Sequence, residues 1–344
     1  MARVWSAVMA LVLVLLVAAS AVAQESGDAG AFRLAFGSCM RQDRPAPVWE
    51  AVVALKPDAF LFLGDNIYGD TTDMAVMRAK YAQLAAVPAF ARLRAATPVL
   101  ATWDDHDYGA NDAGREFPMR AESRAEFAAF FGLDPATLGD GTLGVYHAKT
   151  LGPADLPIQV ILLDTRTFRS PLKKDGKRIV PNDDEDATIL GEAQWVWLAE
   201  QLQRPAKLRV IASSIQFVAD GHRYEKWANF PRERRRLLDL IAETKAHGVV
   251  IVSGDRHSAE IMRLDDTPFG YPLIDATGSA LNQARGVDDP PSPMRVGEVF
   301  PRANFGVLTV DPAAADPTVT LDIRDEAGAV VNTVSVRLSE LVVE

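Results

Sequence analysis

The chain has 344 residues and a formal net charge of −10. Non-specific nucleic-acid binding depends on a basic surface, so this charge argues against it. An acidic protein can still bind phosphate where metal ions supply the positive charge. The composition is ordinary and contains no repeat or low-complexity segment, which leaves room for one large α/β domain or two smaller ones.

The first 23 residues have the pattern of a secretory signal peptide. A short basic start precedes an almost wholly apolar stretch, which ends at the small-x-small cleavage site Ala21-Val22-Ala23. The stretch is too short and wrongly flanked for a membrane span, and it has no twin-arginine pair and no cysteine at the cleavage site. We therefore expect an exported protein, periplasmic or extracellular, that begins at or near Gln24 without a stable membrane anchor. A retained N-terminal anchor is the alternative.

From Phe32 onward, the chain alternates apolar strands with amphipathic helices. Strands are predicted at Phe32–Phe36, Ala59–Leu63, Pro98–Thr102, Gly144–Ala148, Ile158–Leu163, Leu208–Ala212 and Gly248–Val252. Helices are predicted at Val48–Leu55, Met74–Arg94 with an interruption near Pro88, Met119–Phe131, Leu190–Leu202 and Arg232–Ala246. This alternation predicts a layered α/β domain with buried strands.

The C-terminal part has a different pattern, in which strands follow one another through turns. The predicted strands are Phe305–Val310, Thr318–Ile323 and Val330–Val336, with a hairpin closed by Glu326-Ala327-Gly328. We interpret them as an antiparallel end to the same domain, which gives a single domain over residues 31–344. The charged or proline-rich segments Pro171–Asp186 and Asp288–Pro293 are expected to be surface loops.

Five predicted strands lead directly into residues with functional side chains. The five segments are Gly37-Ser38-Cys39, Gly64–Asp70, Trp103–Asp107, Ser213–Gln216 and Ser253–His257. Ligands of open α/β sheets gather beyond the carboxyl ends of the strands. Chance would place such residues after one or two strands, so five indicate a functional site at this edge.

The residue types in these segments indicate metal binding. Five carboxylates would repel one another if they met without cations: Asp65, Asp104, Asp105, Asp107 and Asp255. Carboxylates favour hard cations, whereas a thiolate and a phenolate favour a more acidic transition metal, with Fe(III) as the natural candidate. Taken singly, Asp65 can be read as a turn residue and His257 as a helix N-terminal residue. Together, clustered Cys, His and Asp are typical of metal or catalytic sites.

Cys39 is the only cysteine, so it has no disulfide partner within the chain. Exported proteins usually hold their cysteines in disulfides. A buried inert thiol, an intermolecular link, a reactive thiol and a metal ligand are the alternatives. Its position directly after the first strand favours the metal ligand.

The ordered motifs Gly-Ser-Cys, Gly-Asp-x-x-Tyr, Trp-Asp-Asp-His, Leu-Asp-Thr-Arg and Gly-Asp-x-His resemble those of the PhoD-like alkaline phosphatases. This family belongs to the calcineurin-like metallophosphatase superfamily, and the resemblance runs from Phe32 to about Asn282. It implies a four-layer α/β/β/α sandwich with metals at the sheet edge. It also implies a hydrolase of phosphoric esters that uses Fe(III) and a divalent metal, with Ca²⁺ expected.

The resemblance assigns metal-binding roles by position. Asp65 corresponds to the bridging carboxylate, and Tyr68 and Cys39 to the phenolate and thiolate ligands of iron. Asp105 takes the place of an asparagine in the superfamily's Gly-Asn-His-Glu motif. Asp255 and His257 take the places of its Gly-His-x-His pair.

The resemblance also assigns residues that act on the substrate. His106 takes the place of the histidine that protonates the leaving group or holds phosphate, so His106 and Asp65 are the candidate catalytic residues. Asn111 and Arg166 are candidates for phosphate contact. Gln216 lies where the superfamily supplies a further histidine, and we group it with the substrate side. The family's Asp-Asp-His-Glu is Asp-Asp-His-Asp here.

These residues predict hydrolysis of small-molecule phosphate esters by metal-activated water, in a protein expected to be a monomer. One alternative is a phosphodiesterase, phospholipase D-like or acting on nucleotides, with the same metal ligands. Another is an exported phosphate- or metal-binding protein without turnover; His106 argues against it, because binding needs no proton donor. An oxidoreductase using the iron would need a redox partner, and the sequence has no cofactor motif for one.

Overall fold

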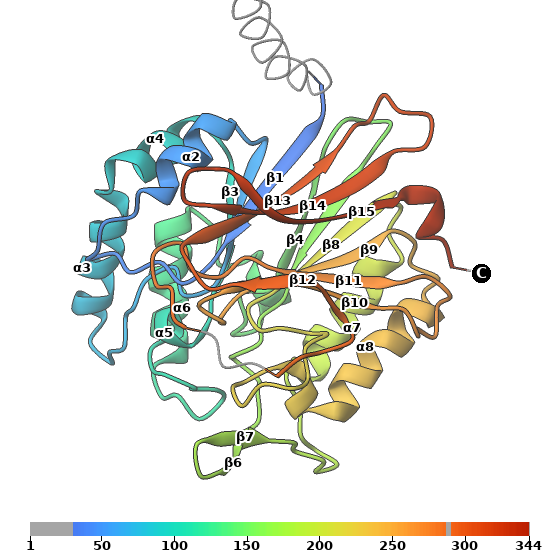
Figure 1. Ribbon diagram of the computed structural model, residues 1–344. Coiled ribbons are helices and arrows are strands. Elements are labelled where there is room, and N and C mark those ends of the chain that lie inside the picture. Colours follow the sequence, from blue (N-terminus) through green and yellow to red (C-terminus); the bar gives the residue numbers. More distant parts are fainter. Residues whose placement is uncertain (1–29, 287–289, 344) are drawn as a thin grey trace, which may run out of the picture.

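The computed structural model describes residues 30–286 and 290–343, so the predicted signal peptide lies outside the described residues. Two β-sheets lie face to face, and helices cover their outer sides (Figure 1). This arrangement is the α/β/β/α sandwich that the family resemblance implied.

The first sheet has six strands in the order β15-β14-β13-β1-β2-β3. The strands β1, β2 and β3 are parallel, and the C-terminal strands extend the sheet from β1 in antiparallel fashion. Their bounds are β1 Phe32–Gly37, β2 Ala59–Leu63, β3 Val99–Thr102, β13 Asn304–Val310, β14 Thr318–Asp325 and β15 Val330–Arg337. The predicted antiparallel end of the chain therefore completes this sheet.

The second sheet has seven strands in the order β12-β10-β11-β9-β8-β5-β4. Its centre is parallel; at one margin β4 pairs antiparallel with β5, and at the other β10 pairs antiparallel with both β11 and β12. The bounds are β4 His147–Leu151, β5 Ile158–Leu162, β8 Leu208–Ser213, β9 Val249–Ser253, β10 Ala259–Leu264, β11 Leu273–Thr277 and β12 Arg295–Phe300. An isolated parallel bridge between Ser38 and Ser279 joins the loops that follow β1 and β11.

Side chains alternate along β1 and β2, so each strand contributes residues to two different hydrophobic cores. Leu34 and Phe36 lie in the core between the sheets. Phe60 and Phe62 lie in the core beneath the helices, where Trp49 packs on Phe60 with ring centroids 5.1 Å apart. Both faces of these strands are buried, which explains why they read as nearly continuous apolar runs.

The helices that cover the first sheet are α2 Val48–Leu55, α3 Met74–Ala85, α4 Pro88–Ala96 and α6 Arg120–Phe131, and those of the second are α7 Gly191–Leu202 and α8 Pro231–Glu243. The predicted helix Met74–Arg94 is two helices, because Val87 is extended and Pro88 starts α4 at a position that needs no backbone donor. Short helices occur at α5 Asp105–Tyr108, Leu138–Gly141, Trp227–Asn229 and Leu338–Glu340. Among the described residues, no helix is long and apolar enough to cross a membrane.

Several strands differ from the sequence prediction. The strand predicted at Gly144–Ala148 begins only at His147, and β10, β11 and β12 were not predicted. The segment Pro171–Asp186, predicted to be a loop, contains a hairpin of β6 Lys173–Asp175 and β7 Arg178–Val180. All three residues of β6 are exposed, so no apolar alternation marks this strand in the sequence.

Candidate metal centre

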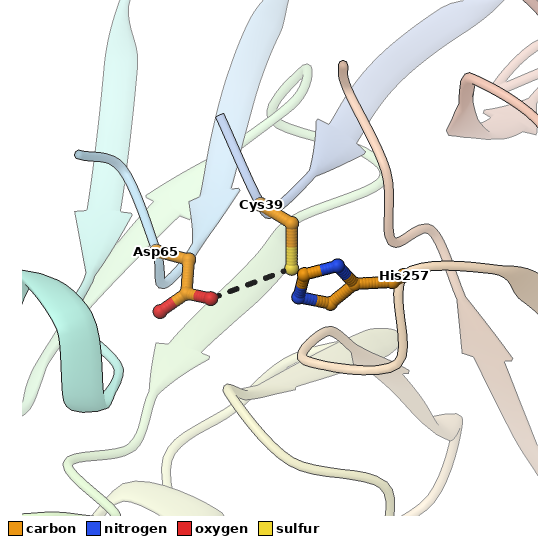
Figure 2. A group of neighbouring side chains, drawn as sticks. All are labelled: Cys39, Asp65 and His257. Atoms are coloured by element: carbon orange, nitrogen blue, oxygen red, sulfur yellow. Dashed lines mark hydrogen bonds between the residues drawn. The ribbon is translucent and has the colours of Figure 1, made fainter. Parts of the chain in front are cut away.

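Four loops bring side chains together where the strands end. Cys39 follows β1, Asp65 follows β2, Asp105 follows β3 and His257 follows β9. The Sγ atom of Cys39 lies 3.5 Å from Oδ2 of Asp65, and Figure 2 shows these two side chains beside that of His257. Residues far apart in the sequence therefore form one polar cluster at this edge.

Asp65 belongs to three overlapping groups of possible metal ligands. Within each group the ligand atoms lie within 4.8 Å of one another. The groups are Cys39 with Asp65 and His257, then Asp65 with Asp105 and His106, and finally Asp65 with Asp104, Asp105 and Asp255. A carboxylate shared in this way has the position needed to bridge two cations.

Tyr68 extends the first of these groups. Its hydroxyl lies 3.2 Å from Nε2 of His257. Burial and the nearby Cys39 raise the pKa of this phenol far above its ordinary value, so ionisation would need a cation beside it. The phenol thus adds an oxygen to the sulfur, carboxylate and imidazole ligands of this group.

The backbone is left-handed at four residues of the cluster. The φ angles are 59° at Cys39, 50° at Asp65, 67° at Asp255 and 59° at His257. Non-glycine residues adopt positive φ uncommonly, and such residues gather at functional sites. The sharp reversals turn each side chain inward directly after its strand.

The acidic groups of the cluster oppose one another's ionisation. Burial and the charge of Asp255 raise the pKa of the Cys39 thiol to about 11. Burial, Cys39 and Asp105 raise the pKa of Asp65 well above its ordinary value, and burial and Asp105 raise that of Asp255 to about 7. Cations among these groups would reverse the effect, because they stabilise the thiolate and the carboxylates.

Several buried polar atoms of the cluster have no hydrogen-bond partner among the described residues. They include Oδ2 of Asp104, Oδ1 of Asp105 and Nδ1 of His257. Buried polar atoms are normally paired, so each such atom calls for an explanation. Together with the donor types, these atoms fit a cluster of bound metal ions.

His106 lies beside this cluster and is held by an acidic partner. Its Nδ1 atom is 2.6 Å from Oδ1 of Asp70, and its ring lies against that of Tyr68, with centroids 4.2 Å apart and planes tilted by 33°. Burial alone would lower the pKa of His106, but the hydrogen bond to Asp70 and the charges of Asp105 and Asp65 raise it to about 10. The imidazole is therefore arranged to hold a proton next to the cluster.

A cleft of about 400 Å³ opens onto the cluster. Asp105, His106, Asp255 and His257 line it, and so does Asn111. Asn111 therefore lies where a molecule in the cleft can meet its side chain.

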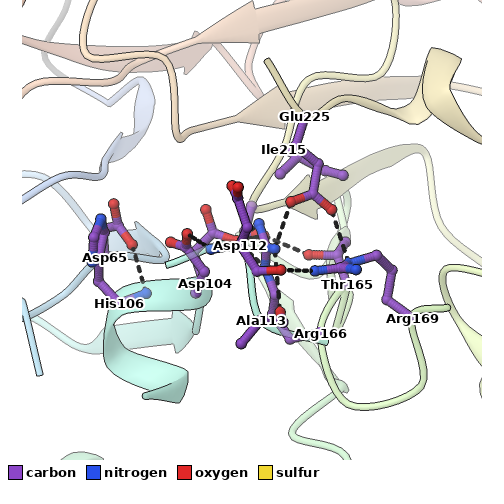
Figure 3. Close-up of polar contacts among 12 residues, drawn as sticks. Asp65, Asp104, His106, Asp112, Ala113, Thr165, Arg166, Arg169, Ile215 and Glu225 are labelled. Atoms are coloured by element: carbon purple, nitrogen blue, oxygen red, sulfur yellow. Dashed lines mark hydrogen bonds and ion pairs between the residues drawn. The ribbon is translucent and has the colours of Figure 1, made fainter. Parts of the chain in front are cut away.

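Arg166, which the sequence predicts to contact phosphate, is not among the residues that line this cleft. The residue is only 1% exposed. Its Nε donates to Oδ1 of Asp104 at 2.5 Å, and Nη1 pairs with Oε2 of Glu225 at 2.6 Å. Figure 3 shows this network, in which Arg169 also pairs with Glu225 at 2.9 Å. The guanidinium of Arg166 is engaged by Asp104 and Glu225. It therefore holds the carboxylate of Asp104 in place from the side away from the cleft.

Gln216 is likewise not among the residues that line the cleft. It is fully buried, and its Nε2 donates to Oε1 of Glu260 and to Oγ1 of Thr277, at 2.8 Å each. Its amide donor is therefore engaged within the second sheet, and the predicted substrate contact of Gln216 stays a prediction.

Asp104 was counted among the acidic residues in the sequence but was not named as a ligand. The structure places its carboxylate with those of Asp65, Asp105 and Asp255. The pair Asp104-Asp105 shortly after a predicted strand is the sequence feature that could have identified Asp104 as a ligand. Asp107 instead supports the loops, because its carboxylate accepts from the backbone amides of Asp65 at 3.3 Å and Asp104 at 2.7 Å.

Comparison with known proteins identifies the class. A family profile described as PhoD-like phosphatase matches residues 34–283, and the chain belongs to this family. It is 23% identical over 269 residues to alkaline phosphatase D of Bacillus subtilis (strain 168). The match covers 65% of this chain and 46% of the relative, so the chain spans less than half of that protein's length. The family resemblance seen in the sequence is confirmed.

Solved structures agree on the fold. A structure of PhoD is similar with a TM-score of 0.72 and 20% identity, covering 91% of this chain and 69% of the other. The purple acid phosphatase PPD1 from yellow lupin (Lupinus luteus) seeds is similar with a TM-score of 0.61 and 11% identity, covering 89% of this chain and 54% of the other. The chain thus shares the fold of these two proteins.

The network behind Asp104 makes a testable contribution to stability. Glu225→Ala leaves Arg166 and Arg169 buried without this carboxylate, so we expect the free energy of unfolding to fall by about 3–5 kcal/mol. Urea denaturation measures this change. The matched control is Glu50→Ala, which removes an exposed ion pair with Arg92 and should cost less than about 1 kcal/mol. Equal losses for the two variants would contradict the prediction.

Proposed function

We propose that the protein is a metal-dependent phosphoesterase that hydrolyses small-molecule phosphate esters. The observation that carries the proposal is the membership of Asp65 in all three ligand groups at the end of the cleft. When bound, metal ions there would lower the pKa of water and neutralise phosphoryl oxygens. Membership of the PhoD-like phosphatase family supports the same activity.

The donor sets support two kinds of metal position. Cys39, Tyr68 and His257 offer sulfur, phenol and imidazole ligands beside Asp65, a set that suits Fe(III). On the other side, Asp104, Asp105 and Asp255 offer only oxygen, which suits a hard divalent ion such as Ca²⁺. Asp65 would belong to both positions.

His106 has the surroundings of a proton donor to the leaving alkoxide. It lines the cleft, and Asp70 fixes its Nδ1 and favours the protonated ring. Asn111 would orient the phosphate from the same cleft. The His106–Asp70 pair favours turnover over simple binding of phosphate or metal, because a binding protein needs no proton donor.

The remaining proposals concern the chain as a whole. Residues 31–344 would form one domain that acts as a monomer. The signal-peptide pattern supports export to the periplasm or the extracellular space, with cleavage before Gln24.

Metal dependence and substrate class can be tested together. We expect the purified protein to contain iron and a divalent metal, to hydrolyse p-nitrophenyl phosphate, and to lose activity on dialysis against a chelator. Metal analysis and release of p-nitrophenol measure these properties, and bis-p-nitrophenyl phosphate measured in parallel gives the diester activity. Hydrolysis of neither ester by metal-loaded protein would refute the proposed function.

His106→Ala should slow turnover by about 10²–10⁴-fold, the usual range for a lost general acid, with metal content near wild type. Steady-state kinetics and metal analysis of the same preparation measure both effects. His106 also belongs to one ligand group, so a loss of metal would make it a ligand instead. Unchanged turnover would make it a bystander.

Cys39→Ala should lose iron and activity, because the thiolate is removed from the first ligand group. Metal per chain and the visible spectrum, in which phenolate and thiolate bound to iron would absorb, report the change. Met40→Leu is the matched control, since Met40 is also fully buried and the substitution nearly preserves volume. A Cys39→Ala protein with full iron and full turnover would refute the assignment.

A further inference from the structure

One oxygen of Asp105 is held by the backbone of a nearby turn, which comprises residues 110–114 and lies just after the short helix α5. The amide of Asp112 in this turn donates to Oδ2 of Asp105 at 2.6 Å. The other oxygen, Oδ1, is buried and has no hydrogen-bond partner among the described residues, and Asp105 belongs to two of the three ligand groups. The turn thus fixes one oxygen and leaves the other to a cation.

The turn needs support from outside, because its own conformation is uncommon. Asp112 has a φ angle of 58°, in the left-handed region that non-glycine residues seldom adopt. Its side chain pairs with Lys174 at 2.7 Å, but the side chains of Asp112 and Lys174 are 30% and 50% exposed. Exposed ion pairs contribute little to the stability of a conformation. The pair with Lys174 therefore does not explain how Asp112 is held.

Arg169, in the loop that follows β5, supplies this support. The side chain is fully buried, and its Nη2 donates to the carbonyl of Asp112 (Figure 3). In addition, the amide of Arg115 donates to the carbonyl of Arg169 at 3.0 Å. A Cβ atom at Gly114 would lie 2.7 Å from that carbonyl oxygen and 2.8 Å from Cζ of Arg169, so only glycine lets the turn come this close. The turn is therefore held against Arg169 on both sides of Gly114.

Arg169 is itself fixed by its own loop and by Glu225. Its amide donates to the carbonyl of Arg166 at 3.2 Å, and its Nε pairs with Glu225 at 2.9 Å. The two arginines of this loop serve neighbouring aspartates. Arg166 pairs directly with Asp104. Arg169 reaches Asp105 through the turn.

We infer that Arg169 is a positioning residue for the metal position formed by Asp104, Asp105 and Asp255, which we call the oxygen-only position. By holding Asp112, Arg169 keeps the backbone amide on Oδ2 of Asp105 and so leaves Oδ1 to the ion. The inference rests on the proposed function, which makes Asp105 a ligand of the divalent metal. The loss of a group that orients a metal ligand typically weakens metal binding.

The effect should be confined to the oxygen-only position. The other ligand group draws on Cys39, Tyr68 and His257, from loops that follow β1, β2 and β9. The bonds of Arg169 described above go instead to the turn, to its own loop and to Glu225. Loss of Arg169 should therefore weaken binding of the divalent ion and leave iron in place.

The test measures Ca²⁺ binding directly, without a substrate. Divalent metal is removed from the purified protein by dialysis against EGTA, and Ca²⁺ is titrated back in a calorimeter. In Arg169→Met, the Kd for Ca²⁺ should rise about 10–100-fold, the usual range for a lost orienting group, with iron per chain equal to wild type.

A second variant covers the case in which Arg169→Met does not fold. Arg169→Lys keeps a cation beside Glu225, but one nitrogen replaces three that have separate partners. Lysine cannot reproduce the planar fork of arginine, so the Kd for Ca²⁺ should rise in this variant too.

Two controls separate this role from simple stabilisation of the fold. Arg209→Met removes another buried arginine, which donates to the carbonyls of Ala206 at 3.1 Å and His247 at 2.7 Å. Arg209 lies at the amino end of β8, whereas the cluster lies at the carboxyl end of the parallel strand β9. This variant should lower the midpoint of urea denaturation and leave the Kd for Ca²⁺ unchanged. Lys174→Ala removes the exposed pair with Asp112 and should also leave this Kd unchanged.

The possible outcomes separate this inference from the proposed function. Unchanged Ca²⁺ affinity in the Arg169 variants overturns the inference, and so does an equal loss of affinity in either control. Loss of iron together with Ca²⁺ also overturns it. A wild-type protein that hydrolyses the esters but takes up no Ca²⁺ contradicts the positioning role and leaves the phosphoesterase intact. The expected pattern of Ca²⁺ binding without hydrolysis of either ester refutes the proposed function and leaves the positioning role intact.

Discussion

The compensation of negative charge around Asp65 is the constraint on which the rest of this structure depends. Its carboxylate is fully buried and shares its neighbourhood with a thiol, a phenol and three further carboxylates. Burial and mutual repulsion raise the pKa of Asp65 and of the Cys39 thiol, and so disfavour their ionised forms. Such a cluster is stable when cations lie within it, and the sandwich provides one edge where the loops from both sheets converge to hold them.

A second compensation of charge, by a buried arginine, lies next to the acidic cluster. Arg166 is fully enclosed between Asp104 and Glu225, and it places a permanent positive charge under the acidic cluster. The same Glu225 also pairs with Arg169, and it directly follows Tyr224, whose ring centre lies 4.7 Å from the guanidinium of Arg256 at the cleft. The buried carboxylate of Glu225 thus connects the arginine that supports Asp104 with residues that line the cleft. The support of Asp104 and part of the lining of the cleft therefore belong to one network of ion pairs.

Much of the fold could be predicted from the sequence, because strands buried on both faces are marked by apolar runs and amphipathic helices lie between them. The hairpin β6–β7 was missed because its first strand is wholly charged and its position depends on contacts with Arg223 and Asn229. The polar cluster was predicted from the types of residue that come directly after the strands. Arg166 and Gln216 follow strands in the same way, so sequence could not show that their side chains turn inward, toward partners supplied by distant loops.

The left-handed backbone at Cys39, Asp65, Asp255 and His257 has a consequence for metal uptake. Each such conformation is held at some cost in free energy, and binding of ions by these side chains would offset that cost. Part of the intrinsic affinity for the ions would go into ordering the loops, so the apparent affinity would be lower. The core between the sheets is made of apolar side chains outside the cluster. Release of the ions would thus loosen the rim of the site as a local opening, while the two sheets stay folded.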